Sequence, residues 1–375
     1  MKIVHVAEYA SGGVATYLRN TISFQLEKDD VDQVILINSI ENSEHINFDS
    51  EKFKHITFDY SRSISNVRKL LRLRKTIDAL KPDIVHYHSS FAGVIRLTYY
   101  LKPASYKIVY CAHGWSFVQK NKSRFQRKVY EIIERILARK TDLIINISKS
   151  EEQKALDHGL PAQKMELIYN TIPNKQTILP VENPFKNVST KKLLFVGRFD
   201  EQKGLNFLLE NTDFETENIE LVIIGESVLK NASINKENKN VRFLGWKDNK
   251  YIDSYMNFCD AVIIPSKWEG FGLVALEAMK NKKMVIASDA GGLSEIIINN
   301  YSGLIFKSNS VMSLNEALTV FSDMSQESVS QMGNIGLDIL KSKYNYYQLS
   351  NRLMKLYESK EIEGQGFLST GSNKI

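Results

Sequence analysis

The sequence predicts an α/β protein with two doubly wound, Rossmann-like domains that face each other across a central cleft. With 375 residues, the chain is longer than one hydrophobic core usually supports. Its first half alternates short apolar runs with longer helical patterns, as parallel strands and crossover helices do. The same alternation begins again after a polar segment rich in proline. In such folds, ligands bind at the carboxyl ends of the strands, so we expect the site between the domains.

The first domain is predicted to span residues 1–172. Gly12 and Gly13 follow its first strand, and a helical pattern covers 14–26. The strands expected in this domain are 2–7, 33–38, 83–87, 107–111 and 143–147.

A linker is predicted at 173–190, where three prolines fall in a polar stretch without periodicity. The second domain is predicted at 191–343. Its expected strands are 192–197, 220–225, 241–246, 261–265 and 283–288. A helical pattern over 344–361 is expected to pack back on the first domain, and the Gly/Ser/Asn-rich tail 363–375 to be flexible.

The composition excludes several classes of protein. Hydrophobic residues make up 43% and charged residues 25%, which is ordinary for a globular protein. No apolar run approaches the roughly 20 residues of a membrane span, and Glu8 interrupts the first apolar stretch too early for a signal peptide. Cys111 and Cys259 are far apart and lack metal-ligand spacing. We therefore expect a cytoplasmic protein with no disulfide and no metal site.

The formal net charge of +6 is unevenly distributed. Residues 62–75 hold six Lys or Arg and no acid, and residues 120–140 hold eight against two glutamates. The chain has no zinc finger, aromatic single-strand platform or basic arm, so we expect no nucleic acid partner. Anionic membrane on the inner face of the cell membrane is the better candidate. For the helical pattern 123–140, the favoured interpretation is a core-facing helix with a charged back, and the alternative is docking on anionic lipid.

The strongest motif is PSKWEGFGLVALEAM at 265–279. An apolar strand ends at Pro265, a glycine-containing turn follows, and a helix is predicted to begin near Gly272. The unpaired N–H groups and positive dipole end of such a helix suit a diphosphate. Glu269 lies in the turn and Glu277 about one turn into the helix, so the two carboxylates can address different parts of one ligand. A plain strand-turn-helix with two solvated glutamates is the alternative.

This motif, with its Glu269-x7-Glu277 spacing, resembles the donor site of the family-4 retaining glycosyltransferases (glycosyltransferase group 1), which have the two-Rossmann-domain GT-B fold. The resemblance implies that 191–343 binds a nucleotide-diphosphate sugar and that 1–172 binds the acceptor. It implies hexosyl transfer with retention, without an enzymatic nucleophile, and with the departing phosphate assisting the acceptor hydroxyl. By family frequency we expect a UDP-sugar donor, and a saccharide or lipid-linked saccharide acceptor in surface polysaccharide or glycoconjugate synthesis.

The resemblance also assigns catalytic roles. Its Arg and Lys, which match Arg198 and Lys203, hold the donor diphosphate, and fixed cations can stabilise the leaving phosphate without a metal. His113, in Cys-Ala-His-Gly, matches a histidine near the transferring sugar that contacts the sugar or the phosphate. The implied catalytic residues are Arg198, Lys203, Glu269 and His113. No cofactor is expected, because the nucleotide sugar is a co-substrate.

Further positions match the family's donor and acceptor sites. The implied donor-binding residues are Gly12, Gly13, Gly197, Gly225, Trp246, Gly270, Phe271, Gly272, Leu273 and Glu277. Ser148 and Asn170 match cleft-lining positions on the acceptor side. Two departures concern local turns: Thr171 stands where the family commonly has glycine, and Gly225-Glu226-Ser227 replaces a frequent Gly-x-Gly. Glu295 is interpreted as supporting structure.

Three other interpretations were weighed. Asp30-Val31-Asp32 matches the Asp-x-Asp of metal-dependent glycosyltransferases, but it precedes a strand and is better explained as a solvated turn. A non-hydrolysing nucleotide-sugar epimerase shares the architecture, although its set of acid/base carboxylates and histidines is not found. A catalytically silent partner subunit of a glycosyltransferase is the remaining alternative.

Overall fold

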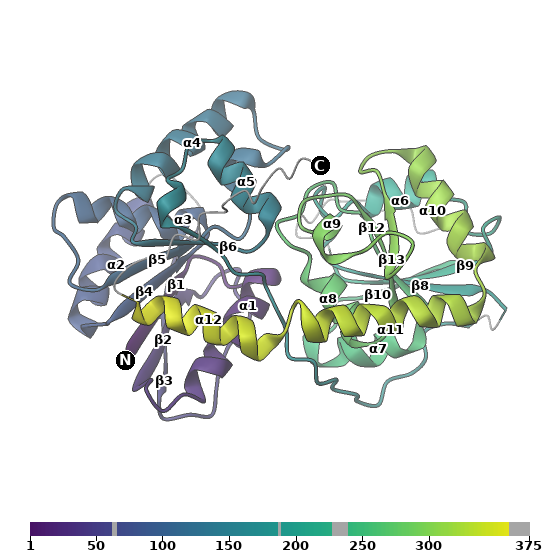
Figure 1. Cartoon of the computed structure of the whole chain (residues 1–375), viewed down its shortest axis with the longest axis horizontal. Helices are drawn as coiled ribbons and strands as arrows, with labels where there is room; N and C mark the ends of the chain where they lie inside the picture. Colours follow the sequence, from purple (N-terminus) through teal and green to yellow (C-terminus); the bar gives the residue numbers. More distant parts are fainter. Residues whose placement is uncertain (62–65, 187–188, 227–238, 360–375) are drawn as a thin grey trace, which may run out of the picture.

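The computed structural model describes residues 1–61, 66–186, 189–226 and 239–359. Two parallel sheets lie side by side, each covered by helices on both faces (Figure 1). The first sheet is built from residues 2–167 and the second from residues 191–306. The predicted fold class is confirmed.

The first sheet has seven parallel strands in the order β3-β2-β1-β4-β5-β6-β7. The direction of winding reverses between β1 and β4. The strands are β1 (Lys2–Ala7), β2 (Gln33–Ser39), β3 (Phe53–Phe58), β4 (Ile84–His88), β5 (Lys107–Cys111), β6 (Leu143–Asn146) and β7 (Met165–Leu167). The sequence analysis missed β3 and β7. They are the two edge strands, where β3 is only partly buried and β7 has three residues, so neither gives a strong apolar run.

The helices of this half are α1 (Gly13–Leu26), α2 (Val67–Leu80), α3 (Ser89–Gly93), α4 (Arg124–Ala138) and α5 (Lys149–Asp157), with 3-10 turns η1 (Val94–Tyr100), η2 (Ser116–Val118) and η3 (Ala162–Lys164). The favoured interpretation of 123–140 as a core-facing helix is wrong. The buried residues of α4 are Glu134, Leu137 and Ala138, whereas Phe125 and Ile132 are exposed. Glu134 is held inside by Arg96 at 2.7 Å, and this buried ion pair turns α4 so that its apolar face points outward.

The second sheet has six parallel strands in the order β10-β9-β8-β11-β12-β13, with its reversal between β8 and β11. The strands are β8 (Lys191–Val196), β9 (Ile219–Ile224), β10 (Val241–Gly245), β11 (Ala261–Ile264), β12 (Met284–Ser288) and β13 (Gly303–Phe306). The helical elements are α6 (Leu205–Asn211), η4 (Asn249–Tyr251), α7 (Ile252–Phe258), α8 (Leu273–Lys280), α9 (Leu293–Ile296), α10 (Val311–Asp323), α11 (Gln326–Ser342) and α12 (Tyr346–Glu358). β13 is short and was not predicted.

The last helix returns to the first sheet. Figure 1 shows α11 beside the second sheet and α12 continuing across to the first. The Tyr357 hydroxyl lies 2.6 Å from Nδ1 of His86, and Lys107 Nζ donates to the carbonyl of Leu356 at 2.6 Å. Residues 360–361 of the expected helix and the tail 363–375 lie outside the described residues.

The described part of 173–190 forms no helix or strand. It nevertheless packs on the second half of the chain. The backbone N–H of Thr177 donates to Asp253 at 2.8 Å, and that of Leu179 donates to Ser254 Oγ at 2.8 Å. Within the described residues, no helix is long and apolar enough to cross a membrane.

Candidate functional site

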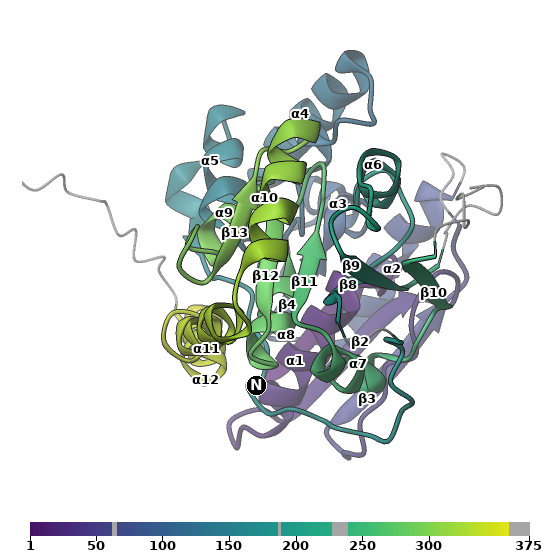
Figure 2. The same cartoon turned by 90° about the vertical axis from the view of Figure 1, so that its right-hand side faces the viewer.

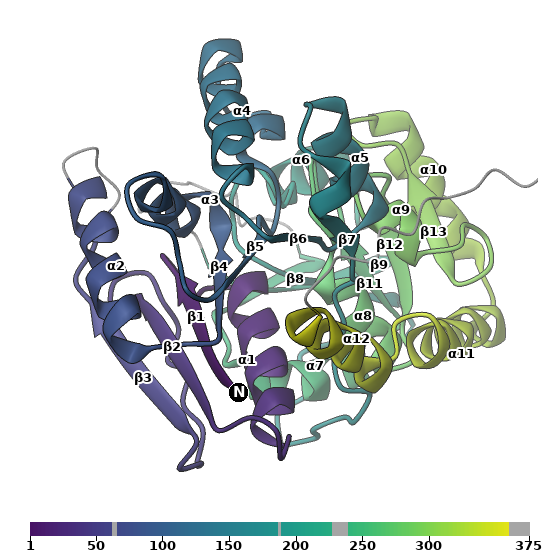
Figure 3. The ribbon, with the colours of Figure 1, turned by 60° about the vertical axis from the view of Figure 1, so that its left-hand side comes forward.

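The two points where the winding reverses face each other. Figures 2 and 3 show α1, which follows β1, beside α8, which follows β11. A Cβ added at Gly13 would lie 4.0 Å from Cδ1 of Leu273, so the glycine-rich turn of the first sheet contacts the start of α8. Loops at such reversals are where ligands of open α/β sheets bind.

Charged side chains gather at the carboxyl ends of the strands of the second sheet. Lys203 Nζ lies 2.6 Å from Oε2 of Glu269, and the Ser266 hydroxyl donates to the same oxygen at 3.2 Å. Arg198, which follows β8, is half-exposed and pairs with Asp200 at 3.0 Å. Arg198 and Lys203 come from the loop after β8 and Glu269 from the loop after β11, and Arg198 and Lys203 have different partners.

Glycines permit the close approaches between these loops. Gly225 has a φ of 144°, and a Cβ there would lie 1.8 Å from the carbonyl oxygen of Gly197. Gly272 caps α8 with a φ of 105°, and a Cβ there would lie 2.5 Å from Leu293. Both positions combine a left-handed backbone with a lack of space, so a larger residue would push the loops apart. Ser227, in the departure from Gly-x-Gly, lies outside the described residues.

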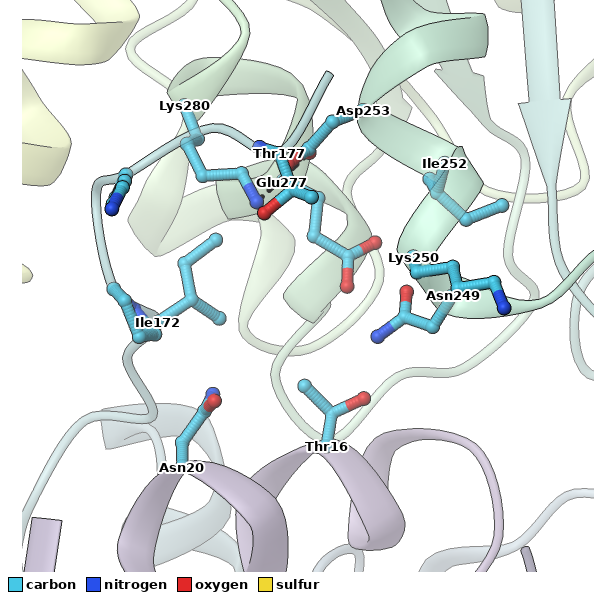
Figure 4. Close-up of a pocket in the computed structure, with 12 residues that line it drawn as sticks. Thr16, Asn20, Ile172, Thr177, Asn249, Lys250, Ile252, Asp253, Glu277 and Lys280 are labelled. Atoms are coloured by element: carbon cyan, nitrogen blue, oxygen red, sulfur yellow. Dashed lines mark hydrogen bonds and ion pairs between the residues drawn. The ribbon is translucent and has the colours of Figure 1, made fainter. Parts of the chain in front are cut away.

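Glu277 points into a cavity of about 350 Å³ between α1 and α8 (Figure 4). Burial raises the pKa of its carboxyl group. The cavity is lined by Thr16, Asn20, Ile172, Pro173, Lys175, Thr177, Asn249, Lys250, Ile252, Asp253, Glu277 and Lys280. Arg198, Lys203 and Glu269 do not line it, so the predicted charges occupy two neighbouring places. Trp246 does not line it either and is 58% exposed.

Polar contacts join the two halves of the chain beside the loop between β11 and α8. The Ser148 hydroxyl donates to the carbonyl of Gly270 at 2.8 Å. The carboxylate of Glu295 accepts from the backbone N–H groups of Lys149 and Ser150 at 2.9 and 2.7 Å, at the first turn of α5. Negative charge at a helix N-terminus is favourable. Glu295 thus fastens the second sheet to the first, a connection between distant segments that the sequence pattern did not reveal.

His113 lies where the first sheet meets that loop. A Cβ added at Gly270 would come within 3.6 Å of the carbonyl carbon of His113. The φ of His113 is 53°, a left-handed conformation that costs energy in a residue with a side chain. Its Nε2 lies 3.0 Å from Nδ1 of His88, and burial lowers its pKa to about 3. The imidazole is therefore neutral at physiological pH.

Glu151 was missed by the sequence analysis. It is buried, and its carboxylate accepts from the N–H groups of Gly114 at 2.6 Å and Ile147 at 2.8 Å. Burial raises its pKa to about 7. Because Gly114 follows His113, Glu151 fixes the turn that carries this histidine. The Ser148-x-x-Glu151 spacing, typical of a helix start, was the available signal.

Of three more predicted positions, Gly12 and Phe271 have structural partners. Gly12 begins α1 with a φ of 55°, and its N–H donates to Glu44 at 2.7 Å. Asn170 is buried and does not line the cavity. Its neighbour Thr171 donates its hydroxyl to the carbonyl of Tyr344, where the family's glycine would offer no side chain. Phe271, beside Gly270, is buried against Tyr344.

Comparisons with known proteins agree with this architecture. The family described as "Glycosyl transferases group 1" matches residues 181–337, and "Glycosyltransferase Family 4" matches residues 11–176. An "Uncharacterized 41.2 kDa protein in cps region" of Klebsiella pneumoniae is 31% identical over 96% of this chain and all of its own length. A UDP-Gal:alpha-D-GlcNAc-diphosphoundecaprenol alpha-1,3-galactosyltransferase of Escherichia coli is 24% identical over 69% of this chain and 71% of its own.

Among solved structures, a sucrose-phosphate synthase from Thermosynechococcus elongatus superposes with a TM-score of 0.78. It is 18% identical and covers 96% of this chain and 98% of its own, which establishes the fold alone. Together, the two family matches cover residues 11–176 and 181–337, and so both halves of the chain. The chain belongs to the family-4, group 1 glycosyltransferases, transferases with the GT-B fold that use a nucleotide-sugar donor and a saccharide acceptor.

Proposed function

We propose that this glycosyltransferase moves a hexose from a UDP-sugar to a saccharide or lipid-linked saccharide, with retention of configuration and without a metal ion. The observation that carries the proposal is the Lys203–Glu269 pair, 2.6 Å apart beside the start of α8 and opposite His113. A cation, a carboxylate and helix N–H groups thus surround one point of the cleft. Such fixed charges suit a phosphate whose negative charge increases as the sugar leaves.

In this proposal, the donor contacts both the group formed by Arg198, Lys203 and Glu269 and the cavity into which Glu277 points. The diphosphate contacts Arg198, Lys203 and the N–H groups at the start of α8, which suit an anion. The ribose hydroxyls donate to Glu277, whose carboxylate points into the cavity in Figure 4. Glu269 exchanges part of its contact with Lys203 for hydroxyls of the sugar. The diphosphate is the stronger partner for Lys203 because it brings two charges.

The acceptor approaches from the first sheet. The name of the Escherichia coli relative includes both a UDP-sugar and a diphosphoundecaprenol-linked sugar, which favours these substrate classes here. No carboxylate is proposed as a nucleophile, because the proposal assigns Glu269 to hydroxyls of the sugar and Glu277 to the ribose. Retention would follow if the leaving phosphate accepts the acceptor's proton on the same face of the sugar.

We also propose that α4 and η1 dock on anionic lipid, which would bring the site to a lipid-linked acceptor. Phe125 is 79% exposed and Ile132 47% on α4, and Leu101, directly after η1, is 91% exposed. Tyr100 connects the two elements, since its hydroxyl donates to the carbonyl of Ile136 at 2.7 Å. Figure 3 shows α4 projecting from the body of the first half.

Cations surround this apolar surface. Eight Lys or Arg lie within 120–140, and Lys102 beside Leu101 is 80% exposed. On the neighbouring α2, Arg68 and Arg72 are also exposed. Arg74 is different, because it is buried against Tyr99 and pairs with Asp78 at 2.7 Å. An apolar strip bordered by exposed cations is the pattern of an interfacial helix on acidic lipid. Arg62 lies outside the described residues.

Vesicle sedimentation tests the docking. The wild type should bind vesicles containing phosphatidylglycerol, and a Phe125→Ser, Ile132→Ser variant should lose at least tenfold in partition, since two large apolar groups no longer enter the interface. Met312→Ser, at an exposed apolar residue of α10 in the other half, is the matched control. Equal partition of the double variant and the control would refute lipid docking through α4.

Calorimetry with a panel of nucleotide sugars tests the donor. Binding of a UDP-sugar, weakened by Glu277→Gln, is the expected result, and NMR of the purified product then shows whether the anomeric configuration is retained. Addition of EDTA should leave the rate unchanged. Absence of any nucleotide-sugar binding would instead support a silent partner subunit, and a sugar altered without acceptor would support an epimerase.

A further inference from the structure

Four of the seven histidines in the chain come together under the cleft. His5 lies on β1 and His86 and His88 on the adjacent β4, where His5 and His86 are paired in register. All three are fully buried between the sheet, α1 and α12. His113, after β5, is the fourth and the one that reaches the cleft. None of the buried three has a role in the proposed transfer.

Three of these rings form a continuous hydrogen-bonded row that begins at Gln25 of α1. The Gln25 Oε1 atom lies 2.8 Å from Nε2 of His5. His5 Nδ1 lies 2.9 Å from Nε2 of His88, and His88 Nδ1 lies 3.0 Å from Nε2 of His113. Each ring therefore points Nε2 back toward Gln25 or the preceding ring, and His5 and His88 point Nδ1 toward the next ring.

The row has a direction because the atom of Gln25 that faces His5 is its amide oxygen, which can only accept. A neutral imidazole carries one N–H donor and one acceptor nitrogen. Facing the Gln25 oxygen, His5 must carry its proton on Nε2, which leaves Nδ1 to accept from His88 Nε2–H. By the same alternation, His88 Nδ1 accepts from His113 Nε2–H. Since only one proton fits each link, His5 and His88, which use both nitrogens in links, are neutral, and His113 carries its Nε2 proton in the last link.

The opposite edge of His113 is then an acceptor. Within the described residues its Nδ1 has no hydrogen-bond partner, and it is not among the buried unpaired atoms. Burial lowers the pKa of His113 to about 3 and that of His5 to about 4, and burial also lowers the pKa of His88. An uncharged acceptor repels a phosphate oxygen and attracts a hydroxyl.

We propose that Gln25, His5 and His88 are positioning residues that hold His113 in its Nε2–H form, so that its Nδ1 accepts a hydrogen bond from a substrate hydroxyl and does not bind phosphate. The proposal deepens the proposed function, on which the identity of the hydroxyl-bearing ligand rests. It excludes His113 as the cation that stabilises the leaving group. That task falls to Arg198 and Lys203.

Nitrogen NMR of the full chain labelled with 15N-histidine tests the row without any turnover. At pH 7 the His113 ring should be neutral with its proton on Nε2, assigned by the loss of its signals in His113→Asn. Asparagine suits the left-handed φ of this position. His45→Asn, at an exposed histidine outside the row, is the control that should leave the rings of the row unchanged. A proton on Nδ1 of His113, or an imidazolium, would overturn the proposal.

The same spectra test whether the row is coupled. Gln25→Met removes the accepting oxygen with little change of shape and should redistribute the proton between the two nitrogens of His113, three hydrogen bonds away. Unchanged His113 signals in a folded Gln25→Met protein would refute the row. Adding UDP should leave His113 neutral, and protonation of its Nδ1 by UDP alone would show phosphate contact and also refute the proposal.

Kinetics separates positioning from mere packing. Gln25→Met should lower the transfer rate about fivefold, the equivalent of one lost hydrogen bond, and should have no further effect in the His113→Asn background. Additive losses in the double variant would contradict coupling through His113. Metal analysis covers the rival arrangement, since the nitrogens of His5, His86 and His88 lie within 4.8 Å of one another. Stoichiometric zinc on these rings would occupy the row's nitrogens and refute it.

Discussion

The loops at the carboxyl ends of the two sheets meet at the cleft, and they differ in the charge and burial of their side chains. The second sheet presents ionised groups, with Lys203 and Glu269 only partly buried and Arg198 half-exposed. The first sheet presents the buried, uncharged His88 and the neutral His113. Exposed charge can meet a charged ligand without a large desolvation cost, whereas buried polar groups must be matched by hydrogen bonds. In the proposed function, the phosphate contacts are confined to the second sheet, whereas the first sheet contributes an uncharged acceptor for a substrate hydroxyl.

The largest expected effect comes from removing the cations in the loops of the second sheet. Arg198→Ala or Lys203→Ala should lower transfer by about 100- to 1000-fold, because the leaving phosphate loses a preorganised positive charge. Circular dichroism should show an intact fold. Lys307→Ala, at an exposed lysine of the same half, is the control. Near-normal turnover of both variants would remove the basis for assigning phosphate chemistry to these loops.

Lowering the pH should reduce the folding stability of the first half of the chain more than that of the second half. Burial lowers the pKa of His5 to about 4 and of His113 to about 3, and it lowers those of His86 and His88 as well. In the unfolded chain these rings titrate near 6.5, so below that pH the unfolded state binds more protons. The stability contributed by these rings is therefore full above pH 6.5 and falls as the pH decreases toward 4, by up to about 1.4 kcal/mol per pH unit for each ring, and the raised pKa of Glu151, about 7, offsets the loss from one ring.

Tryptophan fluorescence can measure this difference between the halves. Trp115 is buried in the first half, and Trp246→Phe with Trp268→Phe leaves it as the only reporter there. Its urea midpoint should fall steeply between pH 6.5 and 4.5. A Trp115→Phe variant, reporting through the other two, should show a smaller change. An equal shift of the urea midpoint with pH in the two variants would contradict the prediction that the buried histidines destabilise the first half more than the second.

The smallest expected effect concerns the contact between the two halves of the chain. Glu295→Gln keeps the shape but removes the charge that meets the N–H groups of Lys149 and Ser150. We expect about 1 kcal/mol less stabilisation of the closed arrangement and about a fivefold lower kcat/KM. Glu316→Gln, at an exposed glutamate of α10, is the control. Unchanged kinetics and an unchanged radius of gyration in solution scattering would show that this contact does not hold the halves together.

The errors of the sequence analysis follow one physical pattern. Central strands such as β1 and β5 were predicted to the residue, because burial on both faces gives a continuous apolar run. The edge strand β3 was missed because it is only partly buried. The helix α4 was found, but its orientation was wrong. The helical spacing of its apolar residues predicted a face that packs on the core. Instead, α4 buries Glu134, which forms an ion pair with Arg96.

The sequence by itself determined the two α/β arrays, the family, and the loop residues from Gly197 to Lys203 and from Glu269 to Glu277, since each depends on residues close together in the chain. Only the tertiary structure joined Gln25 to His113 through His5 and His88, placed Glu295 on α5, and brought Glu151 to the turn after His113. These contacts link segments from different strands and helices. No local spacing encodes them, because strand order and packing decide which distant side chains meet.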